Sequence, residues 1–224
     1  MKDLDLTLDY MENARFNYTY GPLITHMEME SPFTRAELLC LSMVYHKFTL
    51  KNGPRARFLT LMQLSNILEL MFTVTDREIN RRIVARISYD PDCTDPKYAS
   101  DRHCSLASFI RLFSIYFSTD LEQRMQFVFS IYDENDRGFL GREDVVYFVE
   151  KFFTGDDEDE IFELRADMIE VLFAKFDVDK DMIITFEEYC DVVRLQPGLM
   201  EFLGKVYPTQ DQLDSVRLCV NVLS

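Results

Sequence analysis

From about residue 34 onward, apolar side chains recur three and four positions apart, the spacing that puts them on one face of an α-helix. Thr residues precede several of these runs, each with Glu or Gln three positions later, which is the pattern of a capping box. These stripes are most simply the buried faces of a helical core, so the pattern predicts an all-α fold. The stripes include Leu38, Leu41 and Tyr45, then Leu64, Ile67, Leu68 and Met71, then Ile79, Ile83 and Ile87; the capping pairs are Thr34 with Glu37, Thr60 with Gln63, Thr75 with Glu78, Thr119 with Glu122, and Thr209 with Gln212.

The two ends of the chain differ from this pattern. Residues 1–30 carry acids, aromatics and Met without a clean period, and Tyr20, Gly21 and Pro22 favour an extended stretch. We expect a loosely ordered N-terminal arm; the alternative is an arm laid on a partner. Beyond Pro197 the pattern predicts two short apolar helices, 199–206 and 213–222. Such a tail either fills the protein's own groove or docks on a partner.

Residues 177–188 place carboxylates at fixed offsets within twelve residues. Asp177, Asp179 and Asp181 hold the first, third and fifth positions, and Glu188 holds the twelfth. A hard divalent cation takes six to eight oxygen ligands at about 2.3–2.6 Å, and a tight loop supplies them from alternate side chains and from the carbonyl at position seven, here Ile183. This is the ligand spacing of an EF-hand loop, so the sequence predicts a calcium site here.

The sixth position of this loop argues the other way. An EF-hand turns sharply there and uses Gly, whereas this chain has Met182. A Cβ in the left-handed conformation costs about 1–2 kcal/mol. A weakened site for one calcium ion and a vestigial loop kept for its shape, with no ion, both remain open. We favour binding because all four carboxylates are present.

A second loop of the same kind spans residues 133–144. It has the turn residue Gly138, but Arg137 stands at position five, where a ligand belongs. Asp144 closes the loop and is one methylene shorter than Glu, which favours magnesium-like coordination. Arg137 brings a positive charge close to any ion unless its side chain turns out to solvent, so we expect this loop to be empty at resting calcium. Its candidate ligands are Asp133, Asn135, the Phe139 carbonyl and Asp144.

Two earlier loop positions lack the carboxylates that a hard cation needs. The first contains the turn Asn52-Gly53-Pro54 and no acidic residue from 48 to 68. The second follows Ile87, and counting back from the next helix places its closing position at Ser108. Prolines interrupt its acidic residues, which are Asp90, Asp92 and Asp95. Cys93, His103 and Cys104 in the same stretch match no standard zinc spacing, and we interpret the stretch as an exposed irregular loop.

Four loops between helices predict a two-lobed EF-hand fold of paired helix-loop-helix units. The first two hands are degenerate, and short helices follow the last hand. The expected division is an arm at 1–30, an N-terminal lobe at 31–118, a C-terminal lobe at 119–195 and a helical tail at 196–224. The acidic run 156–160, between the third and fourth loops, is expected to be a solvated loop or a helix start.

Composition excludes several classes of function. A net charge of −15 argues against nucleic acid and against anionic membranes, and favours a cation or a basic partner helix. The three His have no positioned partners and no phosphate loop or nucleophile motif occurs, so an enzyme is not expected. Five scattered cysteines and the opening Met-Lys-Asp-Leu-Asp predict a reduced, cytoplasmic compartment.

The order of the loops resembles the neuronal-calcium-sensor branch of EF-hand proteins, and within it the calaxin-like proteins of ciliary and flagellar axonemes. The resemblance implies a place on outer-arm dynein and its docking machinery on doublet microtubules, with coiled-coil docking-complex and dynein subunits as partners. It also implies three loops able to bind metal, and Ser108, Arg137 and Met182 depart from that. The resemblance covers roughly residues 34 to 207, and the segments that carry it are 72–76, 109–117, 121–125 leading into Tyr132 and Asp133, and 186–189.

Two functions remain in view. The first is an axonemal adaptor with weak or residual calcium binding at one loop. The alternative is a calcium-sensor regulatory subunit of the neuronal-calcium-sensor or calcineurin-B type, binding an amphipathic helix of a non-axonemal target. The missing or substituted ligands in the first three loops favour the adaptor.

Overall fold

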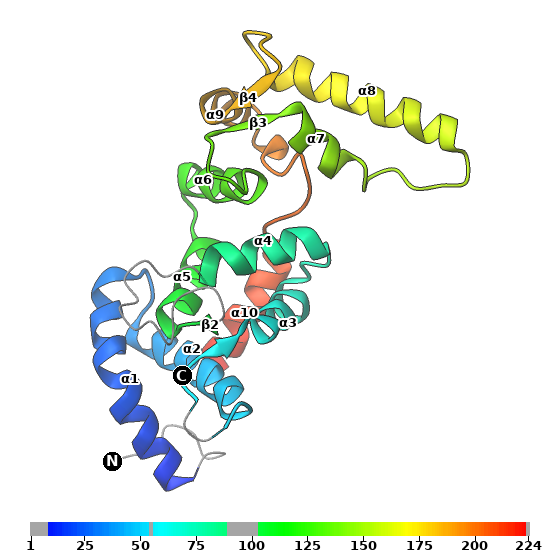
Figure 1. Ribbon diagram of the computed structural model, residues 1–224. Helices are drawn as coiled ribbons and strands as arrows, with labels where there is room; N and C mark the ends of the chain where they lie inside the picture. The colour runs from blue at the N-terminus through cyan, green and yellow to red at the C-terminus, as the bar shows by residue number, and fades with distance from the viewer. Residues whose placement is uncertain (1–8, 54–55, 89–102, 223–224) are drawn as a thin grey trace. The chain divides into compact units, whose positions relative to one another are not determined.

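The computed structural model describes residues 9–53, 56–88 and 103–222, with the backbone alone from 218 onward (Figure 1). By its internal contacts the chain divides into two units. The N-terminal unit comprises residues up to 73, 83–117 and from 208 onward; the C-terminal unit comprises 74–82 and 118–207. The sequence-based division treated 196–224 as one tail, whereas here its first part lies in the C-terminal unit and the rest in the N-terminal unit.

The N-terminal unit is built from helices and one short strand pair. Helix α2 packs against both α1 and α5, and α10 packs against α2 and α3. The strands β1 and β2 pair antiparallel, with Leu59 opposite Cys104. The elements are α1 (Tyr10–Glu30), α2 (Arg35–Leu50), β1 (Leu59–Thr60), α3 (Leu61–Phe72), the second half of α4 (Arg77–Ser88), β2 (His103–Cys104), α5 (Leu106–Phe117) and α10 (Gln210–Val222).

The C-terminal unit has the same plan. Its strands β3 and β4 pair antiparallel, with Leu140 opposite Ile184, and both side chains are fully buried. Figure 1 shows β3 and β4 side by side near the start of α9. The elements are α6 (Leu121–Tyr132), β3 (Phe139–Gly141), α7 (Arg142–Val149), α8 (Glu158–Phe176), β4 (Ile183–Thr185), α9 (Phe186–Leu195) and a 3₁₀ turn (Pro197–Leu199). The all-α EF-hand fold predicted from the sequence is confirmed.

Helix α1 corrects the expectation of a loosely ordered arm. Asp9 caps it by accepting the Glu12 N–H at 2.7 Å, and Phe16, Tyr20 and Ile24 are buried at every fourth position. Pro22 lies inside the helix. It removes an N–H that would bond the Tyr18 carbonyl four residues earlier, and Tyr18 is exposed to water, so solvent can satisfy that carbonyl. The apolar stripe therefore outweighs the local preference for a break.

The start of α8 agrees with the second interpretation of the acidic run 156–160, that of a helix start. Asp157 caps this helix, accepting the N–H groups of Asp159 and Glu160 at 3.1 Å each. Acidic side chains in the first turn complement the positive end of the helix dipole. The run is therefore a helix start, and α8 continues from Glu158 to Phe176.

The capping pairs are correct where no second capping residue competes. Thr34 with Glu37 and Thr60 with Gln63 form complete capping boxes. At α4, however, Asp76 rather than Thr75 accepts the first free N–H groups, at 2.8 and 3.0 Å, and Asp120 rather than Thr119 caps α6. An Asp is as good a cap as a Thr, so the sequence placed these two starts one residue early.

Of the two helices expected in the tail, only the second forms. Residues 213–222 lie within α10, but 199–206 form no helix beyond the 3₁₀ turn. Gly204 explains this, because its φ of +127° is far from helical, and a Cβ there would lie 2.7 Å from Ile79 Cδ1. From residue 200 to residue 207 the segment instead adds apolar side chains to the core of the C-terminal unit, namely Met200, Phe202, Leu203, Val206 and Tyr207. The phenol of Tyr189 donates to the Met200 carbonyl at 2.8 Å, and that of Tyr132 donates to the Gly204 carbonyl at 2.7 Å.

Across the described ranges, every helix is too short or too polar to cross a membrane.

Candidate metal centre

The fourth loop, residues 177–188, gathers carboxylates around one point between α8 and β4. Oxygen atoms of Asp177, Asp179 and Glu188 all lie within 4.8 Å of one another. Asp177 is the C-cap of α8 and is 7% exposed, and it accepts the Met182 N–H at 3.1 Å. These oxygens come from positions one, three and twelve, so three of the side-chain ligands of an EF-hand lie close together in this loop.

Hydrogen bonds from Val178 and Thr185 fix the position of the Glu188 carboxylate. Its Oε2 accepts the Thr185 N–H at 2.9 Å and the Thr185 hydroxyl at 2.7 Å, and its Oε1 accepts the Val178 N–H at 2.9 Å. Burial acts to raise the pKa of Glu188, but these hydrogen bonds outweigh it and hold the pKa below the ordinary value. The closing ligand is therefore ionised at neutral pH.

Asp179 lies among other negatively charged side chains. Desolvation raises its pKa above the ordinary value, and the neighbouring charges of Asp181, Glu188 and Asp177 add to the rise. A like-charged cluster disfavours each ionised carboxylate, and a bound cation would relieve that repulsion. The donor set is all-oxygen and negatively charged, which fits a hard divalent cation such as Ca²⁺.

The other two predicted ligands of this loop are Asp181, which is not among the three clustered side chains, and the Ile183 carbonyl. The Asp181 carboxylate accepts the Ile183 N–H at 3.0 Å, and the Asp181 N–H donates to the Asp177 carboxylate at 3.2 Å. Ile183, whose carbonyl is the candidate ligand, opens β4 opposite Gly141. Met182 has a φ of +70°, so the loop makes the left-handed turn of position six with a Cβ present, as the sequence analysis assumed.

In the third loop, residues 133–144, a guanidinium lies among the candidate ligands. Arg137 pairs with Asp144 and places its Nε 3.8 Å from Asp133 Oδ1. Its guanidinium also lies 4.9 Å from the centre of the Phe139 ring. The sequence left open whether Arg137 turns out to solvent, and it turns inward. Asn135, the position-three candidate, is exposed.

Backbone donors occupy the same carboxylates. Asp133, only 3% exposed, accepts the Gly138 N–H at 2.7 Å, and Asp144 accepts the Gly141 N–H at 2.8 Å. Phe139 lies in β3 opposite Thr185. The residues of the third loop thus fit a divalent ion poorly, because Arg137 already supplies a positive charge there.

The beginning of α4 adds two more arginines to this region. Arg81 contacts Glu134 at 2.7 Å and Arg82 contacts it at 3.3 Å, and Arg82 also donates to the Ile131 and Tyr132 carbonyls at 3.1 and 2.8 Å. Hydrogen bonds from Arg81, then from Arg82, lower the pKa of Glu78 to about 2 against the opposing effect of burial. The end of α6 is therefore fixed just before the third loop begins.

The first loop is closed by amides, a feature that the sequence analysis missed. Pairing of position eight with position eight, as in β3 and β4, makes Asn52 position one and Gln63 position twelve. The Asn52 amide donates to Gln63 Oε1 at 2.8 Å and to the Phe58 carbonyl at 3.3 Å. A neutral Asn and Gln at the two ends of the loop were the available signal.

The second loop lies mostly outside the described residues. Asp90, Asp92, Cys93 and Asp95 are among those not described. The strand register agrees with Ser108 as its closing position, because Cys104 holds position eight. Ser108 is 4% exposed and bonds the Ser105 hydroxyl at 3.1 Å.

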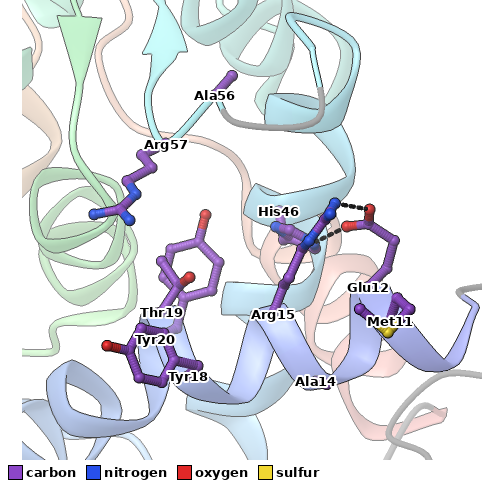
Figure 2. A pocket seen from close by; sticks show the side chains of 10 residues that line it. All are labelled: Met11, Glu12, Ala14, Arg15, Tyr18, Thr19, Tyr20, His46, Ala56 and Arg57. Carbon is purple, nitrogen blue, oxygen red and sulfur yellow. Dashed lines mark hydrogen bonds and ion pairs between the residues drawn. The ribbon is translucent and has the colours of Figure 1, made fainter.

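One pocket in the N-terminal unit lies beside the first loop. It has a volume of about 490 Å³ and lies between α1, α2 and residues 56–57. The Glu12 carboxylate lies 2.8 Å from the Arg15 guanidinium and 3.7 Å from His46 Nε2, and Figure 2 shows these side chains together at the pocket. Burial lowers the pKa of His46, against the opposing charge of Glu12. The pocket holds both signs of charge, and we assign it no ligand.

Comparison with known proteins agrees with this geometry. The EF-hand domain pair family matches residues 122–194. Calaxin of Xenopus laevis is 24% identical over 179 residues, covering 79% of this chain and 82% of its own length. This is a calaxin-like EF-hand protein. Calaxin of Danio rerio is 22% identical over 182 residues, covering 79% and 81%, and calaxin of Homo sapiens is 26% identical over 144 residues, covering 64% of each chain.

The matched EF-hand pair, residues 122–194, contains the third and fourth loops. EF-hand pairs bind Ca²⁺ in general. In this calaxin-like chain the acidic cluster of the fourth loop can hold such an ion, whereas the third loop holds Arg137.

Proposed function

We propose that the protein is an axonemal adaptor with weak calcium binding at the fourth loop. The observation that carries the metal part is the cluster of Asp177, Asp179 and Glu188, whose oxygens lie within 4.8 Å of one another. The first and third loops, by contrast, are closed by the protein's own donors. No catalytic role is proposed.

Similarity to calaxins supports the partner part of the proposal. The proposed partners are coiled-coil docking-complex subunits and outer-arm dynein subunits on doublet microtubules, in a cilium or flagellum. The net charge of −15 favours basic surfaces on those subunits and disfavours nucleic acid and anionic membrane.

The position of the tail favours a fixed adaptor over a sensor that opens. Phe202 stacks on Phe176 with ring centres 4.2 Å apart, and it also packs against Tyr132 and Tyr189. In the N-terminal unit, α10 covers α2 and α3. A sensor of the neuronal-calcium-sensor or calcineurin-B type binds its target helix in such an apolar groove, so that alternative requires this chain first to release its own tail.

Calorimetric titration with calcium, in millimolar magnesium, tests the metal site. We expect one ion in the wild type and a loss of affinity of at least about tenfold in Glu188→Gln, because the bidentate ligand is removed. Glu187→Gln is the matched control: it makes the same change of charge at the neighbouring, exposed position, and it should bind as the wild type does. Identical traces from the wild type and Glu188→Gln would refute calcium binding at this loop.

Cosedimentation with demembranated axonemes tests the partner. We expect the protein to bind doublets that retain the docking complex, equally in EGTA and in calcium, and not to bind doublets stripped of it. Binding that appears only with calcium would favour the sensor alternative. Equal binding to both kinds of doublet, or to neither, would refute the proposed partner.

A further inference from the structure

In the third loop, Arg137 lies where an EF-hand places its ion. The guanidinium pairs with the carboxylate of position twelve, Asp144, and its Nε is 3.8 Å from that of position one, Asp133. Its third neighbour is the ring of Phe139, position seven, 4.9 Å away. One side chain therefore contacts both ends and the middle of the loop, as a bound cation would.

A guanidinium suits this place. It is charged at all physiological pH values and its planar set of N–H donors matches carboxylate oxygens. The Arg137 side chain is 37% exposed and the Asp133 side chain is 4% exposed, so the pair reaches from the surface to a buried acceptor. A divalent ion would have to displace Arg137 and then tolerate its charge nearby.

The surroundings make that displacement harder. Glu134, at position two, is already paired with Arg81 and Arg82 of α4 at 2.7 and 3.3 Å. These two arginines bring further positive charge to the same loop, which disfavours a second cation.

The closed third loop is bonded directly to the fourth. Besides the pairing of Leu140 with Ile184, the Phe186 N–H at the start of α9 donates to the Gly138 carbonyl at 3.1 Å. Gly138 is the turn residue whose N–H binds Asp133. The position of α9, which carries Glu188, therefore depends on the turn that the third loop makes.

We propose that the Arg137 guanidinium replaces the ion of the third loop and keeps that loop closed without metal. The closed third loop then holds α9, and with it Glu188 of the fourth loop, in place for metal binding. The pair then takes up one divalent cation, without the cooperativity of a pair that binds two. Only the part about the fourth loop rests on the proposed function.

The first test restores a ligand to position five in a protein whose fourth loop is disabled. Glu188→Gln alone should bind no calcium in the micromolar range, and Glu188→Gln with Arg137→Asp should bind one ion, both measured by calorimetry with circular dichroism to verify folding. A folded double variant that binds none would overturn the proposal. A site in Glu188→Gln that disappears on adding Asp133→Asn would also overturn it, because the third loop would then bind metal despite Arg137.

The second test removes the internal charge without adding a ligand. Arg137→Gln should lower the metal-free melting temperature by about 2 °C and weaken calcium binding at the fourth loop by about fivefold. Arg142→Gln, an equal change of charge at an exposed residue of the same segment, is the control. Equal behaviour of the two variants would overturn the role of Arg137 in holding Glu188 in place.

The two tests also separate this proposal from the proposed function. If the wild type binds no calcium while the double variant Glu188→Gln, Arg137→Asp binds one ion, the third-loop proposal stands and the fourth-loop site is wrong.

Discussion

Met182 and Gly138 hold the same position in the two paired loops. Their φ angles are +70° and +81°, so both loops make the same left-handed turn, once with a side chain and once without. Met182 is 49% exposed, and its side chain gains little from burial there. The conformational cost of a Cβ in this region, about 1–2 kcal/mol, is therefore largely uncompensated in the fourth loop.

Replacing Met182 with Gly should stabilise the protein. We expect the free energy of unfolding to rise by about 1 kcal/mol, since the relief of strain exceeds the extra chain entropy of Gly. Calcium affinity should rise by at most about tenfold. Urea unfolding followed by circular dichroism, together with calorimetry, measures both quantities.

Gly138→Ala is the converse substitution. A Cβ at Gly138 meets nothing within 4 Å, so its cost is conformational, and we expect a loss of about 1 kcal/mol. If Met182→Gly proved neutral or destabilising while Gly138→Ala behaved as expected, strain at position six would not be what weakens the fourth loop.

Side-chain direction limited what the sequence could reveal at this scale. The identities and spacing of Asp177, Asp179 and Glu188 depend only on the local loop, and the structure brings these three together. The inward turn of Arg137 depends on where Asp133 and Asp144 lie in the folded loop, so its identity alone left two directions open. Likewise, the Asp181 carboxylate accepts the Ile183 N–H, an interaction that the spacing of the ligands does not predict.

At the scale of elements, the ends of the chain were the hardest to predict. In α1 the buried residues Phe16, Tyr20 and Ile24 recur at every fourth position, but Gly21 and Pro22 lie between the last two and hide the helical pattern. Their burial depends on α2, where Phe16 meets His46 with ring centres 5.5 Å apart. The tail shows the opposite error, because an apolar run looked helical while Gly204 prevented a helix and the run became core.

Removing one aromatic ring of the tail should show how strongly it is held. Phe202 is 9% exposed and lies against three buried rings, so Phe202→Ala should cost about 3 kcal/mol of unfolding free energy in the C-terminal unit. Leu195→Ala, at an 83% exposed position in the same unit, should stay within about 0.5 kcal/mol of the wild type. Urea unfolding measures both variants. A small loss from Phe202→Ala would mean that the tail is only loosely attached and free to make way for a target helix.

At the scale of the whole molecule, the metal site and the long helix α1 belong to different units. Calcium at a hundred times its dissociation constant stabilises the bound fold by about 2.7 kcal/mol. We expect hydrogen exchange at β3, β4 and α9 to slow by up to about a hundredfold, with little change in α1 and α2.

The matched control for this exchange experiment is Glu188→Gln, which should show no calcium effect in either unit. Equal slowing of α1 and α9 in the wild type would contradict the assignment of the metal effect to the C-terminal unit.

The inward turn of Arg137 also determines how steeply the occupancy of the loop pair depends on the concentration of free calcium. Two cooperating loops respond steeply, whereas a single loop goes from one-tenth to nine-tenths full only over about an 80-fold rise in free ion. A chain that carries a fixed guanidinium in one loop of the pair therefore gives a graded response. Its occupancy changes in proportion to small rises of free calcium below the dissociation constant, and it approaches saturation only slowly above that concentration.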